Sequence, residues 1–264
     1  MTLTGKLIER TENLPRDRKS LNVWFRHLYQ TNIDVASFID TYVYDSLNLF
    51  SAFEILNADK EMQKSVSDIF SKIKLFELLK GITLEYWLIG DVFILGVLDL
   101  QRVNWEYFVV LNPDQVEVRR YNLLNKFYYE LIPDDFIKKL VLEKTPEYQY
   151  LELKQNAPEI IQAVTNGRNI PIDNAHITHL KHMPVPYGFY GQPLLKSFLT
   201  KLISEDKSVH RDLQNFLGDL CSKRIYAFKN LIEDFVNEKI INPMAETNEW
   251  KKVPVFHIPA KSSD

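Results

Sequence analysis

The sequence predicts an α+β fold, in which helices come first, a mostly antiparallel sheet follows, and long helices end the chain. Three observations predict this order. Apolar residues recur at steps of three and four before residue 89 and again after residue 192, while short β-branched and aromatic runs occupy the middle. Because helices and strands are grouped rather than alternating, the pattern favours α+β over a parallel βαβ arrangement.

Residues 1–58 are predicted to form an arm and N-terminal helices. Residues 10–19 are charged and carry Pro15, which indicates an exposed arm. From Val35 the apolar positions keep helical spacing, so we expect one or two helices as far as about Leu56.

A clearer helix begins after Asp59, whose carboxylate can accept hydrogen bonds from the first N–H groups of a helix. Its apolar positions continue to Phe76, and Gly81 is the predicted end, although residues 82–88 can continue the helix after a bend.

Residues 59–191 are predicted as one α+β unit whose sheet has about four strands. The strand-like runs are Val92–Leu95, Phe108–Leu111, Val116–Val118 and Phe127–Ile132. Asp134 and Asp135 open a short helix, and residues 143–169 look polar and irregular, with one helical turn at 158–164. Ile177 and Leu180 indicate a last strand with both side chains buried.

Residues 192–229 are predicted as a long helix that begins near Pro193. We predict that Gly188 and Gly191, which precede it, form a hinge, since glycine relieves the backbone restriction of a tight turn. Polar residues 204–208 interrupt the apolar stripe of this helix. The stripe consists of Leu195, Phe198, Leu202, Val209, Leu213, Phe216 and Leu220.

Residues 230–264 are predicted to hold a second helix and an edge strand. The helix covers residues 231–241 and Pro243 ends it, while prolines flank the strand at residues 253–258.

Composition excludes several classes of protein. The chain has 264 residues, of which 45% are hydrophobic and 25% charged, as in ordinary globular proteins. Its net charge of −3 lacks the basic excess that tight nucleic-acid binding needs, and eight glycines are few for a nucleotide-binding α/β enzyme. A single cysteine excludes an internal disulfide. The N-terminal residues are too polar for a signal peptide, so we expect a soluble protein that is cytoplasmic at synthesis.

Three histidines, His176, His179 and His182, form the densest cluster of potential ligands. Strand geometry puts His179 on the face opposite the other two, which is poor spacing for a metal. We therefore expect no metal, and we expect the three histidines at a surface or a subunit contact.

Other candidate groups also have structural explanations. Cys221 follows an apolar helical pattern and is expected to be a buried, inert thiol. Asp134 and Asp135 are explained by helix capping. Lys223, Arg224 and Lys229 are typical of a solvated helix face. We expect no catalytic residue and no cofactor, so the chain is predicted not to be an enzyme.

Three segments resemble the portal proteins of tailed bacteriophages. Residues 84–94 resemble the helix-to-strand junction that opens the wing sheet of that family, and residues 109–118 resemble its Leu-x-Pro-x-x-Val-x-Val hairpin. Residues 172–182, followed by residues 187–195, resemble its Ile-x-x-Asp-x-Ile-x-His-Leu-Lys and Tyr-Gly-x-Ser-Pro-Leu signature. The three segments occur in the family's order. The segment from Leu231 to Pro243 is also similar to the helix by which portal chains return to the wing.

The resemblance implies a portal-like fold and a structural function. Portal subunits form a ring, usually a dodecamer, at one capsid vertex, and DNA passes through its channel without sequence specificity during packaging and ejection. The expected partners are other copies of the chain, the major capsid protein, the terminase and a head–tail connector or adaptor, with no membrane. The expected location is the virion, and the host cytoplasm during assembly.

The apolar stripe of the long helix is longer than one core face of a small domain needs. We expect its first half to pack on the wing sheet and its second half to contact neighbouring subunits through Leu213, Phe216 and Leu220, with its opposite face toward the DNA. The DNA-facing residues are expected to be Lys207, Arg211, Lys223 and Arg224. Residues 59–191 then correspond to the wing and residues 192–229 to a stem-like helix.

One departure concerns the stem and clip that such portals insert between the outgoing and returning helices. Only residues 220–229 separate the two helical patterns here, which puts terminase docking most in doubt. Two alternatives stay open, a hydrolase or nuclease with a dispersed site and a non-portal interaction protein of a mobile element.

Overall fold

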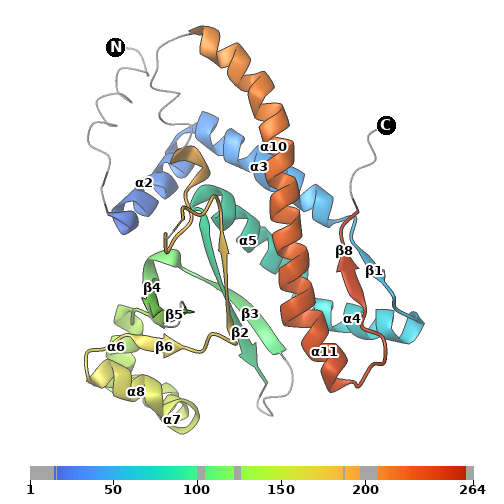
Figure 1. Cartoon of the computed structure of the whole chain (residues 1–264). Helices are drawn as coiled ribbons and strands as arrows, with labels where there is room; N and C mark the ends of the chain where they lie inside the picture. Colours follow the sequence, from blue (N-terminus) through green and yellow to red (C-terminus); the bar gives the residue numbers. More distant parts are fainter. Residues whose placement is uncertain are drawn as a thin grey trace.

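The computed structural model describes residues 15, 17–99, 105–121, 126–186, 188–196 and 207–259, of which residues 207–221 are described by their backbone alone. Figure 1 shows two small sheets on one side of a layer of helices, with the long helix α10 running past that layer. The α+β prediction is confirmed.

The first helix in the described part of the chain, α2 (Arg18–Thr31), replaces part of the predicted arm. The Asp17 carboxylate accepts a hydrogen bond from the Ser20 N–H and so caps the helix. Phe25 and Leu28 are buried and fix α2 on the core. The prediction that the arm extends to residue 19 was therefore wrong at its C-terminal end, because one buried face suffices to hold a largely polar helix.

Three helices follow α2 and lead to the first sheet. The helix α3 (Ile33–Phe50) begins at Asn32 and leads to the short strand β1 (Glu54–Leu56). The helix α4 (Lys60–Lys72) is capped by Asp59, as predicted, and α5 (Leu75–Leu88) follows it.

The predicted helix end at Gly81 is wrong. The chain bends at Lys74, whose φ is 51°, and Gly81 lies inside α5. Burial keeps the helix continuous through Gly81, because Leu78, Leu79 and Ile82 all pack into the core and their burial outweighs the low helix propensity of glycine.

Six of the described strands form two three-stranded antiparallel sheets rather than one sheet. The first sheet has the order β3-β2-β7, and the second has the order β4-β5-β6. The first contains β2 (Asp91–Leu98), β3 (Trp105–Leu111) and β7 (Ile177–Lys181), and the second contains β4 (Val116–Tyr121), β5 (Lys126–Leu131) and β6 (Ile170–Ile172). The antiparallel prediction is confirmed.

The 3-10 helix η1 (Pro113–Gln115) carries the chain from one sheet to the other. Phe93 and Ile177 of the first sheet share one buried cluster with Val116 and Val118 of the second. Hydrophobic contact, not strand pairing, therefore joins the two sheets.

The region predicted as irregular, residues 143–169, contains two helices. Before this region lies a short helix, α6 (Asp135–Leu142). The Asp134 carboxylate caps it by accepting a hydrogen bond from the Ile137 N–H, so the predicted cap is confirmed. The helices α7 (Glu147–Asn156) and α8 (Pro158–Thr165) follow. No side chain of α7 is buried, which explains why its sequence carries no clear helical periodicity.

The predicted separation between two C-terminal helices is wrong. One helix, α10 (Lys207–Val236), runs without a break through residues 220–229, so the expected boundary at residue 229 falls inside it. A π-helix, η2 (Asn237–Ile241), follows, and Pro243 lies in the first turn of α11 (Asn242–Thr247) rather than ending a helix.

The last strand, β8 (Val255–His257), pairs antiparallel with β1, so the predicted edge strand is confirmed. The two form a small ribbon beside α10 (Figure 1). The main core includes Trp87, Phe228 and Ile232, which have no exposed surface. None of the helices in the described part of the chain is long and apolar enough to cross a membrane.

Candidate functional site at the Gly90–Gly191 junction

The three histidines of the sequence cluster lie in three separate surroundings. His176 meets the edge of the Trp105 ring, with ring centroids 5.7 Å apart. His179 stacks on Phe93 at 4.0 Å, and its side chain is only 2% exposed. His182 is also 2% exposed. The expected surface position was therefore wrong for His179 and His182, although Ile177 and Leu180 are buried as predicted.

Asp91 is the group that sequence reasoning missed. Its Oδ1 atom lies 2.7 Å from His179 Nε2 and 2.8 Å from the Gly191 N–H, and the carboxylate side chain is 2% exposed. Asp91 is 88 residues from His179 in the sequence, and it occurs at the start of an apolar run. A buried strand that begins with an aspartate is the only signal that could have pointed to it.

The hydrogen bonds assign the proton of each imidazole. His179 donates from Nε2 to the carboxylate, and its Nδ1 has no partner among the described residues. His182 donates from Nδ1 to the Gln192 carbonyl oxygen at 2.7 Å, and its Nε2 likewise has none there. Each hydrogen bond fixes which ring nitrogen carries the proton when the imidazole is neutral.

Burial lowers the pKa of both histidines. Desolvation outweighs the Asp91 carboxylate and holds the pKa of His179 below its usual value. For His182, burial and the nearby Arg224 guanidinium lower the pKa to about 4, against the hydrogen bond to Gln192.

Backbone groups close the junction. His182 donates its N–H to the Gly90 carbonyl at 2.8 Å, and Gln192 donates its N–H to the His182 carbonyl at 2.7 Å. Gly90 has a φ of +87°, and a Cβ atom on Gly191 would lie 2.1 Å from the Gly90 carbonyl oxygen. Glycine is required here because two backbones touch. Whether Gly188 and Gly191 also act as a hinge stays a prediction.

The predicted contact and channel residues are only partly described. The side chains of Lys207, Arg211, Leu213, Phe216 and Leu220 lie outside the described part of the chain.

The basic residues at the other end of α10 do not share one surface. Lys223 is exposed and Arg224 is partly buried. Lys229 is 8% exposed and lies 3.6 Å from Glu233, so the predicted solvated face is wrong at Lys229. Lys229 belongs to the packed side of the helix.

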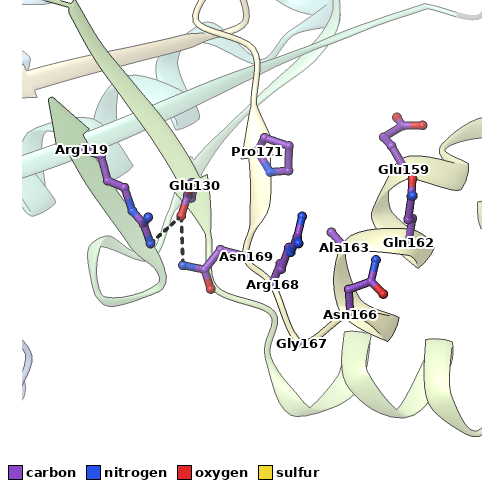
Figure 2. A pocket seen from close by; sticks show the side chains of 10 residues that line it. All are labelled: Arg119, Glu130, Glu159, Gln162, Ala163, Asn166, Gly167, Arg168, Asn169 and Pro171. Carbon is purple, nitrogen blue, oxygen red and sulfur yellow. Dashed lines mark hydrogen bonds and ion pairs between the residues drawn. The ribbon is translucent and has the colours of Figure 1, made fainter. Parts of the chain in front are cut away.

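A polar cavity of about 720 Å³ lies between the second sheet and α8. Figure 2 shows Arg119 and Asn169 both meeting Glu130, while Arg168 and Glu159 face the open space. The Arg119–Glu130 distance is 3.2 Å, and the cavity lining has two arginines and two glutamates. The charges balance, so the lining favours no anion or cation.

The described residues offer no visible catalytic group. No group of three or more His, Cys, Asp or Glu side chains within the described ranges could hold a metal ion. The side chains of Asp91 and His179 are buried. The Asp91 carboxylate accepts hydrogen bonds from the His179 imidazole and the Gly191 backbone N–H, and neither bond activates a nucleophile. Absence of a metal and of catalysis stays a prediction. What the junction can do is fix the path of the chain from β7 into the helices that follow.

Two comparisons with known proteins were negative. No protein-family model matches the chain, and no curated protein matches it either.

Proposed function

We propose that this chain is a portal subunit of a tailed phage, a structural protein that forms a closed ring through which DNA enters and leaves the capsid. Its proposed partners are further copies of itself, the capsid protein, the terminase and a head–tail connector. DNA passes the ring with weak contact, in keeping with a net charge of −3.

The observation that carries the proposal is the meeting of the three portal-like segments. Residues 84–94 contain the start of β2, residues 109–118 contain the end of β3 and the start of β4, and residues 172–182 contain β7. The strands β3, β2 and β7 lie side by side in one sheet, in that order, while β4 belongs to the second sheet. Segments almost 100 residues apart in the sequence therefore meet in the fold. Three short patterns that matched a family by chance would not be expected to meet in this way.

The long helix supports ring formation. The 30 residues of α10 span about 45 Å at 1.5 Å per residue. In Figure 1 its first turns extend past α3 and away from both sheets. A projecting helix suits the head-to-tail interfaces by which identical subunits close into a ring. Leu213, Phe216 and Leu220 occur in this part of the sequence.

Native mass spectrometry of the purified chain tests the proposal, and we expect one closed ring of many subunits. Phe216→Asp should abolish the ring and leave a folded monomer, because it would bury a charge at a subunit contact. Arg211→Ala, on the face proposed to meet DNA, should leave the ring intact and alter only DNA retention.

Two results would count against the proposal. A wild-type chain that stays monomeric at high concentration would contradict the ring itself. Full rings from Phe216→Asp would contradict the assigned contact and leave the ring standing.

A further inference from the structure

We propose that the Gly90–Gly191 junction is an acid-sensitive latch, in which His182 holds the backbone of Gln192 and releases it when the imidazole takes up a proton. The proposal concerns one folded subunit, so it does not depend on ring formation. Its basis is the hydrogen bonds, packing and charges around two buried rings.

The closed latch has a small number of contacts. Asp91 Oδ1 accepts from Gly191, and His182 accepts from Gln192 through its carbonyl and donates to Gln192 through its ring. The glycine backbones meet too closely for any side chain between them. The Gln192 backbone is therefore held by hydrogen bonds to His182, and the Gly191 N–H by Asp91.

Among these groups, His182 is the one whose protonation would weaken the contacts. Its ring meets the edges of Tyr86 and Trp87 of α5, at 5.3 and 5.4 Å between centroids. The positive charge of Arg224 on α10 acts on the His182 ring and opposes a second positive charge there. A proton on Nε2 would have no acceptor among the described residues, so the imidazolium would be buried without a partner.

His179 is better protected against protonation damage. Asp91 of β2 faces it directly, and Lys181 of β7 and Arg18 of α2 act on it from farther away. The rings of Tyr129 and Tyr190 enclose it from β5 and from the segment after β7. The Asp91 carboxylate at 2.7 Å would partly offset the charge of a protonated His179, and His182 has no such carboxylate partner among its hydrogen bonds.

Proton linkage sets the direction of the effect. In the closed latch the pKa of His182 is about 4, below the value of 6.5 of a free histidine. The open form binds a proton more readily, so the latch is fully stable above pH 6.5 and weakens as the pH falls toward 4. Once His182 moves, both of its contacts to Gln192 are lost, while Asp91 still holds Gly191 and Leu194 stays buried in the core.

Amide exchange measured by NMR tests the latch. Between pH 7 and pH 4, after correction for intrinsic exchange, protection of the Gln192 amide should fall on the order of a hundredfold. The Gly96 amide, which donates to the His176 carbonyl at the other end of the β2–β7 pair, should keep its protection and serves as internal control. Equal loss at both amides would mean general unfolding and would overturn the proposal.

Two variants give the matched comparison. His182→Asn keeps a donor near the Nδ1 position and cannot titrate, so its Gln192 protection should stay constant over this pH range. His27→Asn, at an exposed histidine of α2, should behave as wild type. Acid opening that persists in His182→Asn would overturn the latch. If that variant does not fold, ring NMR of the wild type decides, because opening that occurs while His182 remains neutral would also overturn it.

Discussion

Replacing Gly191 with alanine is expected to lower the free energy of unfolding by about 3 kcal/mol or more. The added Cβ would lie 2.1 Å from the Gly90 carbonyl oxygen and 2.8 Å from the His182 nitrogen. Both are backbone atoms, and they are hydrogen-bonded to each other, so neither can move aside without opening the junction. Gly191→Val should be worse still, because its side chain is larger.

A second glycine provides the control. A Cβ on Gly81 would meet Val110 Cγ2 at 3.6 Å, which is ordinary contact, and the residue lies inside α5. Gly81→Ala should therefore stabilise the protein, by up to about 1 kcal/mol. Urea denaturation of both variants measures the difference. Comparable midpoints for the two would show that the junction tolerates a side chain, and the close approach would then not explain Gly191.

Measuring both stability and ring assembly of Gly191→Ala separates a role in packing from a role as a hinge. If Gly191 is needed only for packing, loss of assembly should follow loss of stability. A Gly191→Ala protein that is as stable as wild type but forms no rings would instead favour the predicted hinge.

Local signals predicted much of the fold. The caps at Asp59 and Asp134 depend on residues within the same helix turn, and both are confirmed. The strands β2, β3, β4 and β5 were recognisable because β-branched and aromatic runs ended at turn residues. Such features need no knowledge of what packs against them.

Features that depend on distant contacts could not be predicted in the same way. The division into two sheets follows from the cluster around Phe93 and Val118, which no local pattern encodes. The continuity of α10 across residues 220–229 depends on burial of Ile225 and Phe228 against the core. The Asp91–His179 pair joins strands 88 residues apart, so it became visible only in the folded chain.

Replacing Asp91 with alanine should lower the free energy of unfolding by about 3–5 kcal/mol, since two buried donors would lose their acceptor at about 1–3 kcal/mol each. These donors are the His179 Nε2–H and the Gly191 N–H, and both reach the same carboxylate oxygen. The loss of a side chain that is 2% exposed also leaves a hole in the closely packed interior.

Asparagine at the same position tests whether the acceptor or the charge matters. Asp91→Asn keeps an oxygen where Oδ1 lies, so both hydrogen bonds can persist, and we expect a loss of about 1–2 kcal/mol. Asp45→Ala, at an exposed aspartate of α3, is the surface control and should change stability by no more than about 0.5 kcal/mol. Urea denaturation with near-ultraviolet circular dichroism reports unfolding and aromatic packing together. Should Asp91→Asn be as damaging as Asp91→Ala, the negative charge, rather than the shared acceptor oxygen, holds His179 and Gly191 in place.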